Sequence, residues 1–152
     1  MSWETLLGFA HGLALVMWAV LIFAPRGELA RAAIFYAGIG LLCLAYAVSF
    51  GVLLSQSGAG LANVDITSIE GLRSLFARDA ALVVGWIHYL AFDLFVGLWI
   101  ARDADAKHFS RLFQAPILLL TLVAGPVGLL IWLIIREPAA RRANPRKGKL
   151  KL

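Results

Sequence analysis

The sequence predicts an all-α protein that crosses a membrane several times, as a four-helix bundle with one short amphipathic helix. Of its 152 residues, 61% are hydrophobic and 15% are charged, whereas a water-soluble domain has about 45–50% apolar residues and about a quarter charged ones. The mean hydropathy of +0.84 agrees. Such a chain cannot cover an apolar core with a polar surface, so a water-soluble fold and intrinsic disorder are both excluded. The length indicates a single domain.

Four long apolar stretches predict four transmembrane helices. They cover residues 6–24, 32–54, 80–101 and 112–135. Each has about the 20 residues that a helix needs to cross the hydrocarbon core at about 1.5 Å per residue. A lone strand could not pair its backbone groups within lipid, so each stretch must be helical. We expect a membrane domain over residues 1–136 and a basic, disordered tail over residues 137–152.

The charges predict how the bundle is oriented. Seven of the 14 Lys and Arg residues lie from Arg136 onward, and a basic tail after an apolar stretch is typical of a cytoplasmic flank. With four spans, the N-terminus, loop 55–79 and the tail share one side and carry nine cations, against five in the other loops. The positive-inside rule then predicts that both termini are cytoplasmic. The expected partner is the lipid bilayer, not a nucleic acid, and the oligomeric state stays open.

The loop between the second and third spans contains a predicted short helix. Residues Thr67 to Glu70 fit a capping box, with Thr67 as the N-cap and Glu70 at position N3. One apolar stripe follows, formed by Ile69, Leu72, Leu75 and Phe76. We interpret this segment as an amphipathic helix in the membrane interface. The alternative is a lid over the bundle with no membrane role.

The third span carries the most informative polar residue, Asp93. A carboxyl group about 20 Å along a membrane helix costs a few kcal/mol, so it needs a partner and usually has a function. Tyr89 lies four residues earlier and can donate a hydrogen bond to it. At 100° per residue, one arc of this span is entirely aliphatic, and we interpret it as the lipid face; it comprises Val83, Ile87, Leu90, Leu94, Leu98 and Ala101. The opposite arc, bounded by His88 and Asp93, would then face the bundle interior.

Depth along straight helices adds candidates from the other spans. Tyr46 lies level with His88, about 12 Å into the membrane, and Thr121 lies level with Asp93, about 20 Å in. His11 lies about 7 Å inside the first span. The alternative to a functional site is that Asp93 bonds Tyr89 or Thr121 only to fix the packing of the helices.

The segment from Trp86 to Phe95, WIHYLAFDLF, resembles the signature of the ABA4-like family. The resemblance extends to residues 72–76 and 115–128, and it covers roughly residues 66–136. Plant members are chloroplast membrane proteins needed to make neoxanthin. The resemblance therefore implies a four-span protein linked to the isomerisation of violaxanthin to neoxanthin. No signal or transit peptide precedes the first span, so we expect a bacterial member in the inner (cytoplasmic) membrane.

One function compatible with these residues is a carotenoid isomerase-like enzyme. Opening an epoxide to an allene requires protonation of the ring oxygen and removal of a carbon-bound proton. A buried carboxylic acid can be the proton donor, so Asp93 is the candidate acid, oriented by Tyr89, and His88 could accept the second proton. The isoprenoid ligand would lie among Trp86, Phe92, Phe95, Tyr46 and Thr121.

The other function is a non-catalytic membrane protein that binds haem, a quinone or a pigment. His11 and His88 lie on spans predicted to run parallel, at depths about 4–5 Å apart. Two such imidazoles could hold a b-type haem through its axial positions. Three histidines are too few for a membrane metal-dependent hydroxylase. We therefore predict no metal site and no cofactor apart from this haem alternative.

Overall fold

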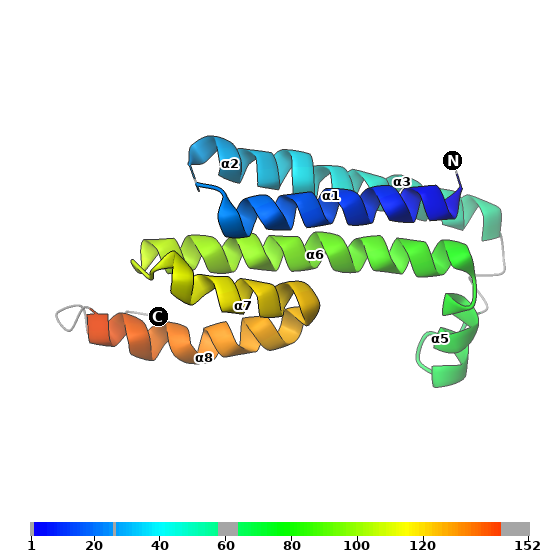
Figure 1. Cartoon of the computed structure of the whole chain (residues 1–152). Coiled ribbons are helices and arrows are strands. Elements are labelled where there is room, and N and C mark those ends of the chain that lie inside the picture. Colours follow the sequence, from blue (N-terminus) through cyan, green and yellow to red (C-terminus); the bar gives the residue numbers. More distant parts are fainter. Residues whose placement is uncertain (1, 26, 58–63, 144–152) are drawn as a thin grey trace.

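The computed structural model describes residues 2–25, 27–57 and 64–143, and all secondary structure in these ranges is helical, as predicted. The helices are α1 (Trp3–Phe23), α2 (Glu28–Ala32), η1 (Ala33–Gly40), α3 (Leu41–Ser57), α5 (Ile69–Phe76), α6 (Asp79–Ala106), α7 (Arg111–Val123) and α8 (Gly125–Ala143). Helix α6 is central, with α1 and the α2–η1–α3 helix on one side and α7 and α8 on the other (Figure 1).

Within the described ranges, three helices are long and apolar enough to cross a membrane, namely Trp3–Phe23, Glu28–Gln56 and Asp79–Ala106. They confirm the helices predicted at 6–24, 32–54 and 80–101. The second one runs without interruption from α2 through η1 to α3, with a π-helical segment over Ala33–Gly40. At its start, α1 is capped by Ser2, whose side chain accepts a hydrogen bond from the backbone N–H of Thr5 at 3.1 Å.

The fourth predicted span, 112–135, is not one helix. Helix α7 ends at Val123, the backbone of Ala124 leaves the helical region (φ −146°, ψ 72°), and α8 begins at Gly125. Pro126 contributes to this break because it has no N–H to continue the helical ladder. The 13 residues of α7 extend only about 20 Å, which is short of the roughly 30 Å hydrocarbon core. A single span was predicted here, whereas the chain reverses its direction after α7 (Figure 1).

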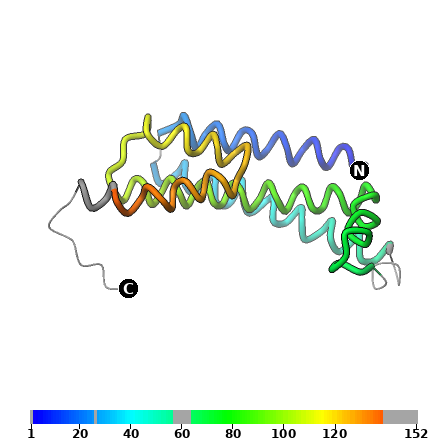
Figure 2. The backbone as a smooth tube through the Cα atoms, turned by 90° about the horizontal axis from the view of Figure 1, so that it is seen from below, coloured from blue at the N-terminus to red at the C-terminus, as the bar shows by residue number. Residues whose placement is uncertain are grey.

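Helices α7 and α8 form an antiparallel hairpin against one half of α6 (Figures 1 and 2). Gly128 allows the two helices to approach closely, since a side chain there would meet the backbone and hydroxyl of Thr121. Because the hairpin returns to the end where it began, the end of α8 and the start of α1 lie at opposite ends of the bundle. The side of the membrane on which each terminus lies stays a prediction. Helix α8 also continues to Ala143, into the predicted tail, while residues 144–152 lie outside the described ranges.

The aliphatic arc of α6 is buried and is not a lipid face. Its six residues are between 0% and 8% exposed, with Leu94 completely covered. Nearby, the ring of Trp18 from α1 occupies the space where a side chain at position 97 would begin, which explains Gly97. Lipid tails are as apolar as leucine, so an aliphatic arc suits a helix–helix contact and a lipid contact equally. Whether this arc contacts protein or lipid depends on how many helices pack around α6, and the sequence does not show that number.

The short helix α5 lies where the sequence predicted it, but its cap differs. Ser68, not Thr67, is the N-cap, and its hydroxyl accepts from the backbone N–H of Gly71 at 3.1 Å. Glu70 does not complete a capping box; it pairs with Arg73 at 2.8 Å. Thr67 instead bonds Asp65 through both its hydroxyl and its backbone N–H. The interfacial role of α5 stays a prediction.

Candidate functional site

The buried acid of α6 lies against the break between α7 and α8. Asp93 is 9% exposed, and its carboxyl occupies the space where a side chain at position 125 would begin, so Gly125 is required for this approach. Its Oδ2 atom is buried and accepts no hydrogen bond from the described part of the chain. Buried polar groups normally have partners, and an exception calls for an explanation.

Tyr89 connects this acid to the surface of α6. It lies one helical turn before Asp93, and its phenol interacts with the Asp93 carboxyl and with the backbone N–H of Gly125. The ring is half-buried and contacts the exposed ring of Trp86, with 5.3 Å between centroids. The structure places the two side chains next to each other, and the hydrogen bond from Tyr89 to Asp93 that the spacing suggested stays a prediction.

His11 reaches the same group of residues from α1. Its Nε2 atom accepts a hydrogen bond from Trp86 Nε1 at 2.9 Å, and the two rings lie 5.8 Å apart. A continuous series of contacts therefore runs from His11 through Trp86 and Tyr89 to Asp93. Depth alone placed His11 at a similar level in the bundle, but it did not identify Trp86 as its partner.

His88 lies elsewhere. Its ring stacks on Phe92 with 4.5 Å between centroids and contacts Tyr46 of α3 at 5.4 Å. Trp86 and His88 are two residues apart, which places them about 160° apart around a helix. His11, which bonds Trp86, and His88 thus lie on opposite sides of α6. The structure therefore does not bring His11 and His88 together as an axial haem would need, while His88 and Asp93 lie on different sides of α6, as their five-residue spacing predicted.

The outward side of α6 carries an aromatic stripe. His88, Phe92, Phe95 and Trp99 follow one another at spacings of four, three and four residues, and all four are exposed. A groove of about 440 Å³ adjoins the part of this stripe that is nearest to the C-terminal end of α6. It is lined by Phe35, Phe95, Leu98, Trp99, Arg102 and Asp103. Phe92 and Phe95 thus lie together on one surface, while Trp86 lies on another.

Thr121 is buried at the tip of the hairpin and serves its packing. Its hydroxyl donates to the backbone carbonyl of Ile117 at 2.8 Å, within α7. It lies against Gly128 of α8, as described above. The depth match between Thr121 and Asp93 stays a prediction.

An ion-pair cluster at the other end of the hairpin was not anticipated. Asp103 accepts hydrogen bonds from both the Nε and a terminal nitrogen of Arg136 at 2.8 Å, and from the indole of the fully buried Trp132 at 3.0 Å. Lys107 lies 3.5 Å from the same carboxylate. These contacts attach α8 to the end of α6. In the sequence, the only indication of these ion pairs was a cluster of charged residues after residue 101, and such a cluster is typical of an ordinary loop.

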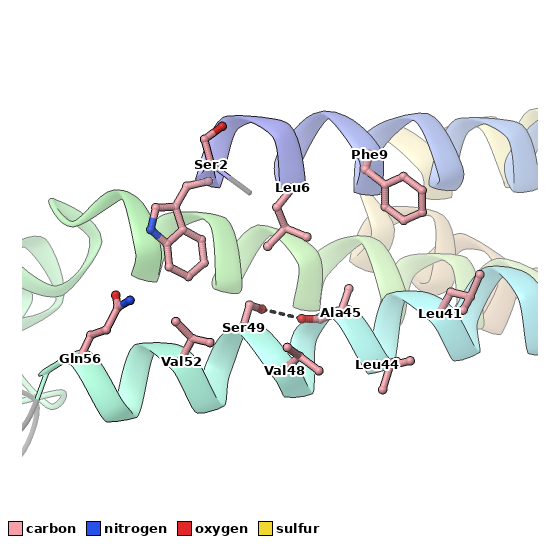
Figure 3. Close-up of a pocket in the computed structure, with 11 residues that line it drawn as sticks. Ser2, Leu6, Phe9, Leu41, Leu44, Ala45, Val48, Ser49, Val52 and Gln56 are labelled. Atoms are coloured by element: carbon pink, nitrogen blue, oxygen red, sulfur yellow. Dashed lines mark hydrogen bonds between the residues drawn. The ribbon is translucent and has the colours of Figure 1, made fainter.

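A second, larger groove lies between α1 and α3 (Figure 3). Its volume is about 560 Å³, and its lining comprises Ser2, Trp3, Leu6, Phe9, Leu41, Leu44, Ala45, Val48, Ser49, Val52 and Gln56. The Ser49 hydroxyl is already used within α3, where it donates to the carbonyl of Ala45 at 2.6 Å. The apolar side chains of this groove resemble those of any membrane helix, so hydrophobic pattern alone does not reveal it.

Metal ligands are not gathered in the described ranges, where no three His, Cys, Asp or Glu side chains group together. The fold is that of a helical membrane protein, with three membrane-length helices and a hairpin that meets a buried acid on the central helix. The chain belongs to the ABA4-like family (ABA DEFICIENT 4-like), which matches residues 5–132. This confirms the family that the sequence suggested. Neither a curated protein nor a solved structure matches the chain.

Proposed function

We propose that this protein lies in the cytoplasmic membrane of a bacterium and isomerises an isoprenoid lipid of the carotenoid class by proton transfer. The observation that carries the proposal is the Asp93 carboxyl, which is buried with one oxygen unpartnered and with the Tyr89 phenol beside it. An unpartnered buried acceptor costs about 1–3 kcal/mol. A purely structural acid would be expected to have both oxygens satisfied, so this cost favours a functional role.

Access to the acid supports a relay through Tyr89. Asp93 is too deeply buried to touch a ligand directly, whereas Tyr89 is half-buried beside exposed apolar surface. Leu82 and Trp86, on the same stretch of α6, are 50% and 42% exposed. An isoprenoid chain in the membrane would contact this surface, with a polar group directed at the phenol.

The chemistry needs no oxidant or reductant. Tyr89 donates its proton to an oxygen of the substrate and regains one from Asp93. The resulting carboxylate then accepts, again through Tyr89, the proton removed from a substrate carbon. Atoms and electrons balance, and both side chains return to their starting states. His88, which lies on another side of α6, has no part in this scheme.

The test is conversion of violaxanthin by the purified protein in lipid vesicles, followed by chromatography of the pigment isomers. General acid–base catalysis is typically worth about 10²–10⁴-fold, so Asp93→Asn and Tyr89→Phe should each lower the rate by at least 100-fold with little change in thermal stability. Asp79→Asn, which changes an exposed acid on the same helix, should convert pigment at the native rate. A fully active Asp93→Asn variant, or a native protein that retains pigment without converting it, would overturn the proposal.

A further inference from the structure

The hairpin changes which segments share an end of the bundle. The α1–α2 turn, the α6–α7 turn and the end of α8 lie together, and the start of α1, the end of α3 and α5 lie at the opposite end (Figures 1 and 2). A continuous fourth span would have placed the end of α8 beside α5. The number of cations at each end therefore differs from the number that a continuous fourth span would give.

Most of the described cations lie at one end of the bundle. Those with described side chains are Arg31, Arg102, Lys107, Arg111 and Arg136. By sequence, Arg26 falls between α1 and α2, Arg141 and Arg142 fall in the last turn of α8, and Arg146, Lys147, Lys149 and Lys151 follow that helix. We call this the cationic end. Among the described residues, seven cations lie at the cationic end and only Arg73 and Arg78 lie at the other, a division of seven to two; the remaining five cations, at positions 26, 146, 147, 149 and 151, lie outside the described ranges.

We infer that the cationic end faces the cytoplasm, against the anionic headgroups of that leaflet, and that the N-terminus and α5 face the opposite side. Lys and Arg flanking membrane helices are retained on the cytoplasmic side and attract anionic lipid. The seven-to-two division of the nine described cations is more uneven than the five-to-four division that the same cations would have with four spans. It also reverses the predicted location of the N-terminus.

Acidic side chains at the cationic end do not cancel this asymmetry. Asp103 forms ion pairs with Arg136 and Lys107. Arg111 donates a hydrogen bond to the backbone carbonyl of Ala24 at 2.8 Å. Orientation depends on the number of Lys and Arg residues, to which Asp and Glu contribute little. Arg102 is exposed and is available to headgroups.

The same arrangement makes residues 111–143 a re-entrant hairpin that enters and leaves the membrane on the cytoplasmic side. Leu112 and Val123, at its entrance and its tip, are 89% and 78% exposed, which suits lipid contact. Its backbone is helical on both sides of the break, and the break itself is covered by α6 at Asp93. Non-helical backbone is tolerated at membrane depth when protein covers it.

The test is cysteine accessibility in intact bacterial cells expressing the full chain. The native Cys43 is changed to Ser, and single cysteines are introduced by Glu70→Cys in α5, Ala106→Cys at the end of α6 and Lys151→Cys near the C-terminus. Labelling by a membrane-impermeant maleimide is compared with labelling after detergent solubilisation. We expect Glu70→Cys to be labelled in intact cells at least tenfold more than the other two.

The outcomes separate the arrangements without reference to catalysis. Equal protection of Glu70→Cys and Lys151→Cys, with Ala106→Cys labelled, would mean four spans and would overturn the inference. Labelling of Ala106→Cys and Lys151→Cys alone would retain the hairpin but overturn the orientation. A reporter enzyme fused after Leu152, active only in the cytoplasm, provides an independent measurement and should be active.

Discussion

Asp93 of α6 and Gly125 of α8 lie in direct contact, although the whole of α7 lies between them in the sequence. The carboxyl of Asp93 fills the position that the first side-chain carbon of residue 125 would occupy. The glycine therefore belongs to the acid's site as much as Tyr89 does. It brings the N-terminus of α8, a region of partial positive charge, against a carboxyl group in the middle of the bundle.

Gly125→Ala should destabilise the hairpin and displace Asp93. The added methyl group meets the carboxyl group of Asp93, so that carboxyl or α8 must move, at a cost of about 1–3 kcal/mol. Thermal unfolding in detergent measures this loss. Gly12→Ala is the matched control, because a side chain at position 12 meets nothing within 4 Å. Equal melting temperatures for the two variants would show that the close approach is absent.

Asp103→Asn should loosen the attachment of α8 to α6. The change removes a bidentate, charge-assisted pair with Arg136, which is largely shielded from solvent, and such bonds contribute about 1.5–3 kcal/mol each. Limited proteolysis near the end of α8 and the melting temperature both report the loss. Glu70→Gln removes an exposed pair with Arg73 and should change stability by less than about 1 kcal/mol. Similar effects of the two substitutions would contradict the assigned role of Asp103.

Leu94→Ala should be strongly destabilising, because Leu94 is core and not lipid-facing. A buried leucine truncated to alanine typically costs about 2–5 kcal/mol through the cavity it leaves. Leu44→Ala, at a side chain that is 59% exposed, makes the same chemical change on the outer surface and should have a small effect. The two melting curves decide between a core arc and a lipid arc on α6.

The turn before α5 should weaken in acid. The hydroxyl of Thr67 donates to Asp65 at 2.6 Å and its backbone N–H at 2.9 Å, and these bonds lower the pKa of the Asp65 carboxyl below its ordinary value. A carboxyl whose folded-state pKa is lowered stabilises the fold above its unfolded-state pKa of about 3.9, and this contribution disappears as the pH falls through the lower folded-state pKa. Amide exchange of Gly71 should therefore accelerate in that range. In the Asp65→Asn variant, the amide of Gly71 should exchange faster at neutral pH, and its exchange rate should no longer increase in this acidic range.

Local composition and spacing were sufficient for part of this structure. The helices at 6–24, 32–54 and 80–101 followed from apolar length alone, because lipid requires every backbone group to be paired within the helix. The Tyr89–Asp93 pair followed from the four-residue spacing, and WIHYLAFDLF pointed to the family. Each of these features depends on residues close together in the chain.

Only the tertiary structure determined the features that depend on contacts between segments far apart in the sequence. Residues 112–135 are apolar enough to span, and the reversal at Gly125 becomes visible only when Asp93 of α6 is seen to occupy the space beside it. The aliphatic arc of α6 became core because helices pack around α6 on several sides. In a membrane protein both lipid and protein neighbours are apolar, so hydrophobic pattern identifies the helices but does not determine which face each neighbour covers.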